Sequence, residues 1–141
     1  MQAPIALLAD AANVSREGKL NILGQFDTIY TERVPVVWPM MTLVVKLEAT
    51  AGEGPKHRIG VRVVDEDGNP AGPQVNVEAE FGKPARRGLP YSANWILPIG
   101  NAVFQKHGTI TFEILADDHN IASIDLHIRP TTELQTGPQQ P

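Results

Sequence analysis

The dominant pattern in this chain is the alternation of hydrophobic and polar residues. Four segments show it most clearly, at residues 43–49, 59–63, 75–81 and 110–116. In the second of them, Ile59, Val61 and Val63 lie on the face opposite Arg58 and Arg62. Because successive side chains of a strand point to opposite faces of its sheet, each segment predicts a strand with one buried face and one face in water.

Weaker patterns raise the expected number of strands to about eight. Residues 122–128 alternate, and residues 20–29 begin a strand that changes its hydrophobic face, which we attribute to a bulge or bend at Gly24. Residues 5–11 and 93–97 are weaker strands, and the alanine-rich start at 3–12 is also compatible with a helical turn. Twelve glycines and twelve prolines separate the hydrophobic runs. The sequence therefore predicts an all-β, antiparallel sandwich, jelly-roll or immunoglobulin-like in outline.

Two hairpins are specific enough to predict their registers. The first turns at residues 65–70, which places Val61 opposite Ala79 and Arg62 opposite Glu78. The second turns at residues 118–120, with Asn120 in the left-handed conformation and Ile114 opposite Ile124. That second register sets Glu113 opposite Asp125 on the outer face, which is a destabilising pair of like charges.

We expect one β-sandwich domain over residues 1–129, followed by a Pro-, Gln- and Thr-rich tail at 130–141. The tail has no periodicity and cannot bury a core, so it is expected to be flexible or held by a partner.

Composition narrows the function further. The chain has 141 residues and a net charge of −4, so we expect no binding to nucleic acid, which requires a clustered basic surface. The absence of cysteine excludes disulfides, thiolate zinc sites and cysteine nucleophiles. We find no signal peptide or apolar membrane span, so we expect a cytoplasmic protein, or part of a particle assembled there, with no membrane contact.

Several stretches carry a resemblance to a known family. They read ALLADAA at residues 6–12, GKLNILGQFD at 18–27, GTITFEILADD at 108–118 and IASIDL at 121–126. In these stretches the chain resembles a family of small bacterial proteins of unknown function. The resemblance implies a compact β-rich domain and supplies no activity, ligand or catalytic residue.

Three groups of residues are candidate sites. The first is an outer-face cluster of two carboxylates and an imidazole, Glu113, Asp125 and His127, which would bind a metal or share a proton if it converged. An arginine that neutralises the pair is the simpler interpretation. The second is a calcium site from two acidic loops, formed by Asp65, Asp67, Asp117 and Asp118, although such loops are also ordinary turns.

The third group is hydrophobic and lies in segments that alternate poorly: Trp38, Met40, Met41, Tyr91 and Trp95. Large exposed hydrophobic side chains mark interfaces, although the two tryptophans can instead close the ends of the sandwich. A basic loop at 83–88 is a further, weaker candidate for partner contact. No serine lies in a Gly-x-Ser-x-Gly context, and the four histidines show no metal-ligand spacing.

We therefore expect a non-catalytic structural or interaction module with no cofactor. Its partner would be a protein, first of all a second copy, in a homo-oligomer or a larger assembly such as a viral shell or filament. A sandwich that binds carbohydrate or calcium is the alternative, and an enzyme that uses Glu113, Asp125 and His127 is the third interpretation.

Overall fold

The computed structural model describes residues 1–134, and these residues fold into nine strands and one short 3-10 helix. In chain order they are β1 (Gln2–Val14), β2 (Leu20–Phe26), β3 (Thr28–Thr31), β4 (Val36–Ala49), β5 (Lys56–Val64), β6 (Val75–Glu80), β7 (Tyr91–Phe104), β8 (Gly108–Ala116), β9 (His119–Pro130) and η1 (Thr131–Glu133). The alanine-rich start is strand β1, and not a helical turn. The predicted tail overlaps the described residues only as far as Leu134, and its remaining part lies outside them.

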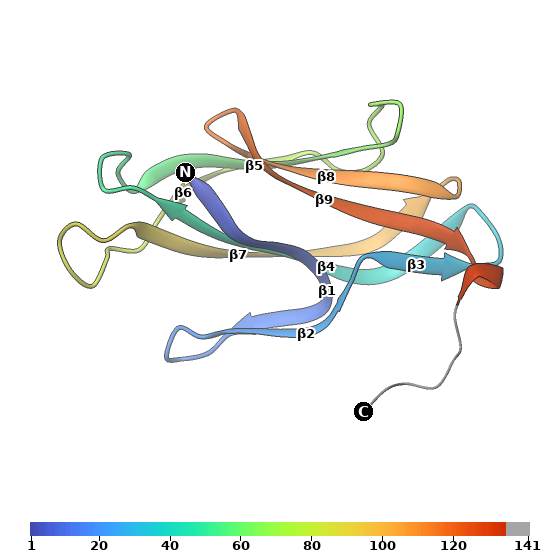
Figure 1. Cartoon of the computed structure of the whole chain (residues 1–141), viewed down its shortest axis with the longest axis horizontal. Coiled ribbons are helices and arrows are strands. Elements are labelled where there is room, and N and C mark those ends of the chain that lie inside the picture. The colour runs from blue at the N-terminus through green and yellow to red at the C-terminus, as the bar shows by residue number, and fades with distance from the viewer. Residues whose placement is uncertain (135–141) are drawn as a thin grey trace.

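The strands form two sheets that pack face to face in a sandwich-like arrangement (Figure 1). The first sheet has the order β2-β1-β4-β7, and the second has the order β3-β9-β8-β5-β6. One hydrophobic core lies between them, to which both sheets contribute fully buried side chains such as Leu43 and Val45 from β4 and Ile114 and Leu126 from β8 and β9. The alternation in the sequence is thus confirmed as the pattern of a two-layer, all-β fold.

The connection from β2 to β3 explains the change of hydrophobic face after Gly24. The chain leaves the first sheet after Phe26 and joins the edge of the second, where β3 runs parallel to β9. The pairing of β1 with β2 keeps one register on both sides of Gly24, so of the predicted bulge or bend the bulge is wrong. Gly24 has φ +70°, a conformation that favours glycine, and a Cβ there would also meet the exposed side chain of Asp10.

The predicted register of the first hairpin is wrong. Val61 lies opposite Val75, not Ala79, and Arg58, not Arg62, lies opposite Glu78. The connection between β5 and β6 is longer than predicted, because it contains an isolated β-bridge between Val64 and Pro70 before β6 begins. The inward face of β5 is unaffected, since a shift by an even number of residues leaves every side chain on the same face.

The register of the second hairpin also differs. Ile114 lies opposite Ala122, and a two-residue turn at Asp117 and Asp118, with φ values of +50° and +68°, joins β8 to β9. Positive φ at both central residues is the type I′ geometry that matches the twist of a hairpin. Asn120 therefore pairs within the strands, and the predicted contact of Glu113 with Asp125 does not form.

At an irregularity in the first sheet, the hydrophobic side chains change from one face of the sheet to the other. Trp38 pairs with Ala102 and Met40 with Gly100, and Asn101 between them has φ +51°. Trp38 and Met41 both pack on the core although they are three residues apart, so the strand changes face between them. Met40 is consequently directed to the outer face.

Candidate functional site

The most tightly bonded polar cluster lies at the start of β5 and centres on His57. Its Nδ1 is 2.7 Å from Oδ2 of Asp117, and its Nε2 is 2.7 Å from the carbonyl oxygen of Gly54. The backbone N–H of Arg58 donates to Oδ1 of Asp117 at 3.0 Å, and the His57 ring packs on Phe81 at a centroid distance of 5.1 Å. We refer to the His57 ring, the Asp117 carboxylate and the Gly54 carbonyl as the His57 cluster.

The two partners of His57 determine its charge. A carbonyl oxygen and an ionised carboxylate only accept hydrogen bonds, so both ring nitrogens must carry hydrogen, which describes the imidazolium cation. Burial lowers the pKa of His57, but the bonds to Asp117 and Gly54 and the nearby carboxylate of Glu53 outweigh this and raise the pKa above 6.5. Hydrogen bonds from Arg58 and His57 in turn lower the pKa of Asp117 below 3.8.

The carboxylate of Glu53 keeps a negative charge near this cluster. It accepts hydrogen bonds from the amino group of Met1 at 2.7 Å and from the backbone N–H of Thr50 at 2.9 Å, which lower its pKa to about 2.

The His57 cluster is suited to holding the chain together. His57 is only 7% exposed and both its nitrogens are occupied, so in this state the ring has no lone pair for a metal or for base catalysis. Its bonds join the loop before β5 to the turn between β8 and β9. His57 was not among the site residues predicted from the sequence, although it continues the inward series of Ile59, Val61 and Val63 and is thus placed to be buried.

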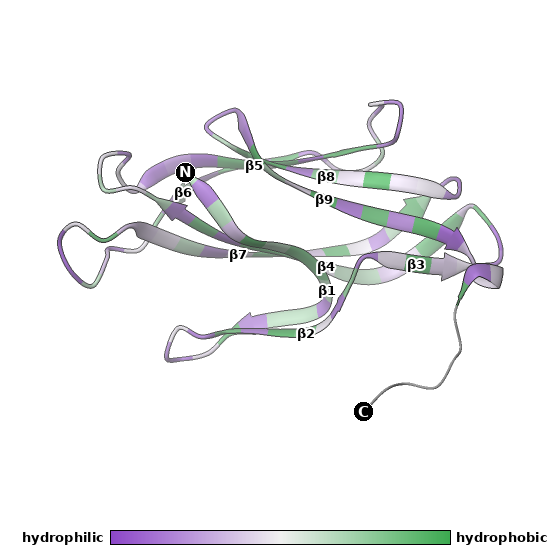
Figure 2. Ribbon diagram, viewed as in Figure 1, coloured by the Kyte–Doolittle hydropathy of each residue, from purple (hydrophilic) through white to green (hydrophobic). Residues whose placement is uncertain are grey.

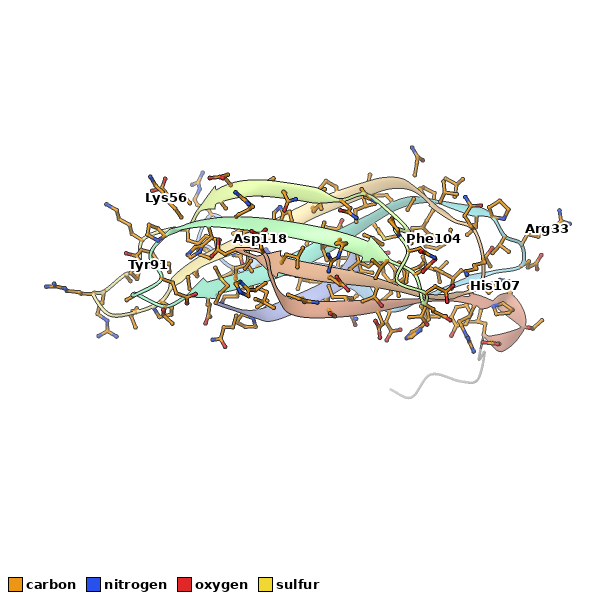
Figure 3. The ribbon with its side chains drawn as sticks, turned by 90° about the horizontal axis from the view of Figure 1, so that it is seen from above. Arg33, Lys56, Tyr91, Phe104, His107 and Asp118 are labelled. Carbon is orange, nitrogen blue, oxygen red and sulfur yellow. The ribbon has the colours of Figure 1, made fainter. Side chains whose placement is uncertain are left out.

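The acidic loops proposed for calcium lie at opposite ends of β5: Asp65 directly follows this strand, and Asp117 lies beside Arg58 near its start. Asp67 forms an ion pair with Lys106 at 3.8 Å, next to the end that Figure 3 labels with Phe104 and His107. Asp118 lies at the other end, beside Lys56 (Figure 3). Asp65 accepts the backbone N–H groups of Asp67 and Asn69 at 2.9 Å, which is ordinary turn chemistry. The four aspartates therefore do not converge on one ion.

The outer-face cluster of the second sheet is separated into individual pairs. Glu113 accepts a hydrogen bond from Nε of Arg62 at 2.7 Å. Asp125 accepts one from Oγ1 of Thr111 at 2.9 Å, and Nδ1 of His127 lies 3.0 Å from Oγ1 of Thr109. No group of three or more metal-ligating side chains forms within residues 1–134.

The predicted interface residues occupy different environments. Met41 is fully buried in the core, and Trp38, Tyr91 and Trp95 are half-buried against it. Among them Met40 is the exposed one, on the outer face of the first sheet.

Met40 belongs to an exposed hydrophobic patch, and it is the member of that patch that was predicted as an interface residue. Val37 on β4 pairs directly with Val103 on β7, and these side chains are 56% and 46% exposed. Met40 is 52% exposed and lies over Gly100 of the same pair of strands. We call Val37, Met40 and Val103 the apolar patch.

The outer faces of the two sheets differ in character. That of the second sheet is polar across β5, β8 and β9, and along β9 Figure 2 shows hydrophilic and hydrophobic positions in turn. That of the first sheet carries further hydrophobic side chains: Leu7, Val44 and Ile96 pair in a row across β1, β4 and β7, and Ile5 pairs with Lys46. The first sheet therefore has hydrophobic side chains on both faces.

A cavity of about 430 Å³ lies at the end of the sandwich near the N-terminus, between β1, the end of β4 and the connection from β6 to β7. Its lining includes Met1, Glu48, Thr50 and Pro90 and contains no aromatic ring. This cavity therefore lacks the aromatic platform on which a sugar would stack.

These observations define a two-sheet, all-β protein whose first sheet carries hydrophobic side chains on its outer face, with Val37, Met40 and Val103 exposed among them. A family model matches residues 4–129, and the chain belongs to this family, DUF6941, a family of unknown function. The match confirms the resemblance to a family of unknown function. No curated protein matches the chain. Among residues 1–134, no helix has the length and hydrophobicity needed to cross a membrane.

Proposed function

We propose that this protein is a non-catalytic structural or interaction module that works through contact with other protein chains. The observation that carries the proposal is the apolar patch on an outer face that is hydrophobic along much of its length. Val37 and Val103 lie side by side on neighbouring strands, Met40 lies three residues further along β4, and each is about half exposed. Contiguous exposed hydrophobic surface is the usual mark of a protein interface.

The contrast between the sheets supports this proposal. An antiparallel sheet with one face in water normally carries polar side chains on that face, as the second sheet does with Arg62, Glu113 and Asp125. Val44, on the outer face of the first sheet, is instead fully buried between Leu7 and Ile96. An outer face of this composition favours contact with another protein over contact with solvent.

The partner we propose is a second copy of the chain, in a homo-oligomer or in a larger assembly such as a shell or filament. That the protein acts in the cytoplasm, or in a particle assembled there, stays a prediction. The jelly-roll or immunoglobulin-like topology of the sandwich also stays a prediction.

Sedimentation velocity across the micromolar range tests the proposal. We expect the unmodified chain to associate and Val103→Lys to weaken the association, because the charge would have to be buried in the contact. Val77→Lys is the matched control, since Val77 is an exposed valine on the other sheet. A strictly monomeric unmodified chain at every concentration would refute self-association.

A further inference from the structure

The first sheet extends into a hairpin that lies outside the two stacked sheets. It consists of the second half of β1 and of β2, which are residues 10–26, and we call it the arm (Figure 1). Within the described residues, the extensive contacts of β2 are all with β1. A two-stranded ribbon is marginally stable by itself and gains stability when a hydrophobic face is covered.

Both faces of the arm carry hydrophobic side chains. Ala12 pairs with Ile22 on one face, and Ala11 pairs with Leu23 on the other. Leu23 is 71% exposed, and Ile22 is exposed as well. Only one face can lie toward the body of its own chain, so the other face remains for a partner.

The arm begins beside the apolar patch. The pairing of β1 with β4 ends at Ala9 and Thr42, two residues from Met40, and β1 then continues into the arm. The same chain thus carries an exposed apolar ribbon and an exposed apolar patch near the root of that ribbon. This proximity allows two copies related by a two-fold axis to exchange arms reciprocally.

The arm and the patch contain most of the exposed hydrophobic surface. Within residues 1–134, ten large hydrophobic side chains are exposed, and six of them lie in these two places: Val14, Ile22, Leu23, Val37, Met40 and Val103. Of these six, Val14 and Ile22 lie on the opposite face of the arm from Leu23. Leu23 and the three residues of the patch offer roughly 400 Å² per chain, or about 800 Å² for two chains, which matches the apolar share of an interface of about 1,400 Å².

Resting on the proposed function, we propose that the arm of one protomer packs the Leu23 side of its ribbon on the apolar patch of a second copy, with the reciprocal contact completing a dimer. The partner is a copy of this chain because one chain supplies both surfaces, and two sets of them reach the area of a stable dimer.

Cysteine cross-linking tests the contact directly, since the chain has no cysteine of its own. Leu23→Cys and Val103→Cys are purified separately, mixed and oxidised at a concentration at which the unmodified chain associates. We expect a disulfide between the two variants, and a much lower yield when Val77→Cys replaces either of them. The position of each disulfide is established by mass spectrometry of peptides.

A second measurement separates the arm from the general proposal. Leu23→Lys should weaken association about tenfold or more, as a central contact residue does, while circular dichroism stays that of the folded chain. If Val103→Lys weakens association but Leu23→Lys does not, and Leu23→Cys forms no disulfide with Val103→Cys, the arm contact is refuted and self-association stands. If the unmodified chain never associates, both proposals fail.

Discussion

The His57 cluster makes the stability of this protein depend on pH in a defined direction. The pKa of His57 in the folded chain lies above the ordinary value of 6.5. The stabilisation from its charged form is therefore fully present below pH 6.5 and is lost as the pH rises through the higher folded-state pKa. One titrating group changes the free energy of unfolding by at most about 1.4 kcal/mol per pH unit within that interval.

The substitution His57→Gln removes this titration and keeps a similar shape. The glutamine amide can donate to the Gly54 carbonyl, but it cannot at the same time donate to Asp117. A hydrogen bond to a charged group contributes about 1.5–3 kcal/mol, and this value must be reduced because the Asp117 side chain is 48% exposed. We expect a loss of about 1–2 kcal/mol near pH 6, which shrinks as the pH rises.

Chemical denaturation at a series of pH values measures this difference. The variant should show a flatter dependence than the unmodified chain as the pH rises from about 6.5 through the folded-state pKa of His57. His119→Gln is the control, since His119 is exposed and its ring contacts a backbone carbonyl. Equal slopes for the unmodified chain and His57→Gln, or an NMR titration midpoint of His57 below 6.5, would refute the reasoning.

Three further outcomes follow from the geometry. Gly24→Ala should destabilise the chain by about 1–3 kcal/mol in denaturation experiments, because residue 24 has a positive φ and the added Cβ would contact Asp10. Adding Asp10→Ala to this variant should recover only the part of the loss that is due to the contact. Arg62→Gln should cost no more than about 1 kcal/mol, since its ion pair with Glu113 is at the surface, and a larger loss would contradict this. Calcium should leave the melting temperature unchanged, because the acidic loops lie far apart, and a clear rise would indicate a binding site.

The sequence predicts which residues face the core much better than which residues are neighbours. Ile59, Val61 and Val63 are all buried, as their alternation indicates. The register of β5 with β6 was nevertheless wrong, because a shift of four positions along β6 keeps the same residues inward. Turn geometry decides between such registers, and Asp117 and Asp118 show that aspartates can take the two left-handed positions as well as the predicted Asn120.

The His57 cluster illustrates what a single sequence does not display. His57 and Asp117 are 60 residues apart, and the turn between β8 and β9 brings them together. The burial of His57 follows from its place in the alternation, and a buried histidine requires partners for both nitrogens. The identity of those partners depends on which turn lies over the ring, and this is a property of the tertiary fold.

The segments that alternated poorly contain the strongest functional signal. The run from Val36 to Met41 consists of hydrophobic residues and Pro39, and the residues from Trp95 to Ile99 are hydrophobic too. Both runs belong to the first sheet, whereas the alternating strands β5 and β8 belong to the second. A continuous hydrophobic run is typical of a strand that is covered on both faces. In this chain the inner face of the first sheet is covered along its whole length, whereas the outer face is covered only in part. If that outer face normally met water, lysine at Val103 would be neutral, so its effect on association distinguishes a covered face from a merely hydrophobic one.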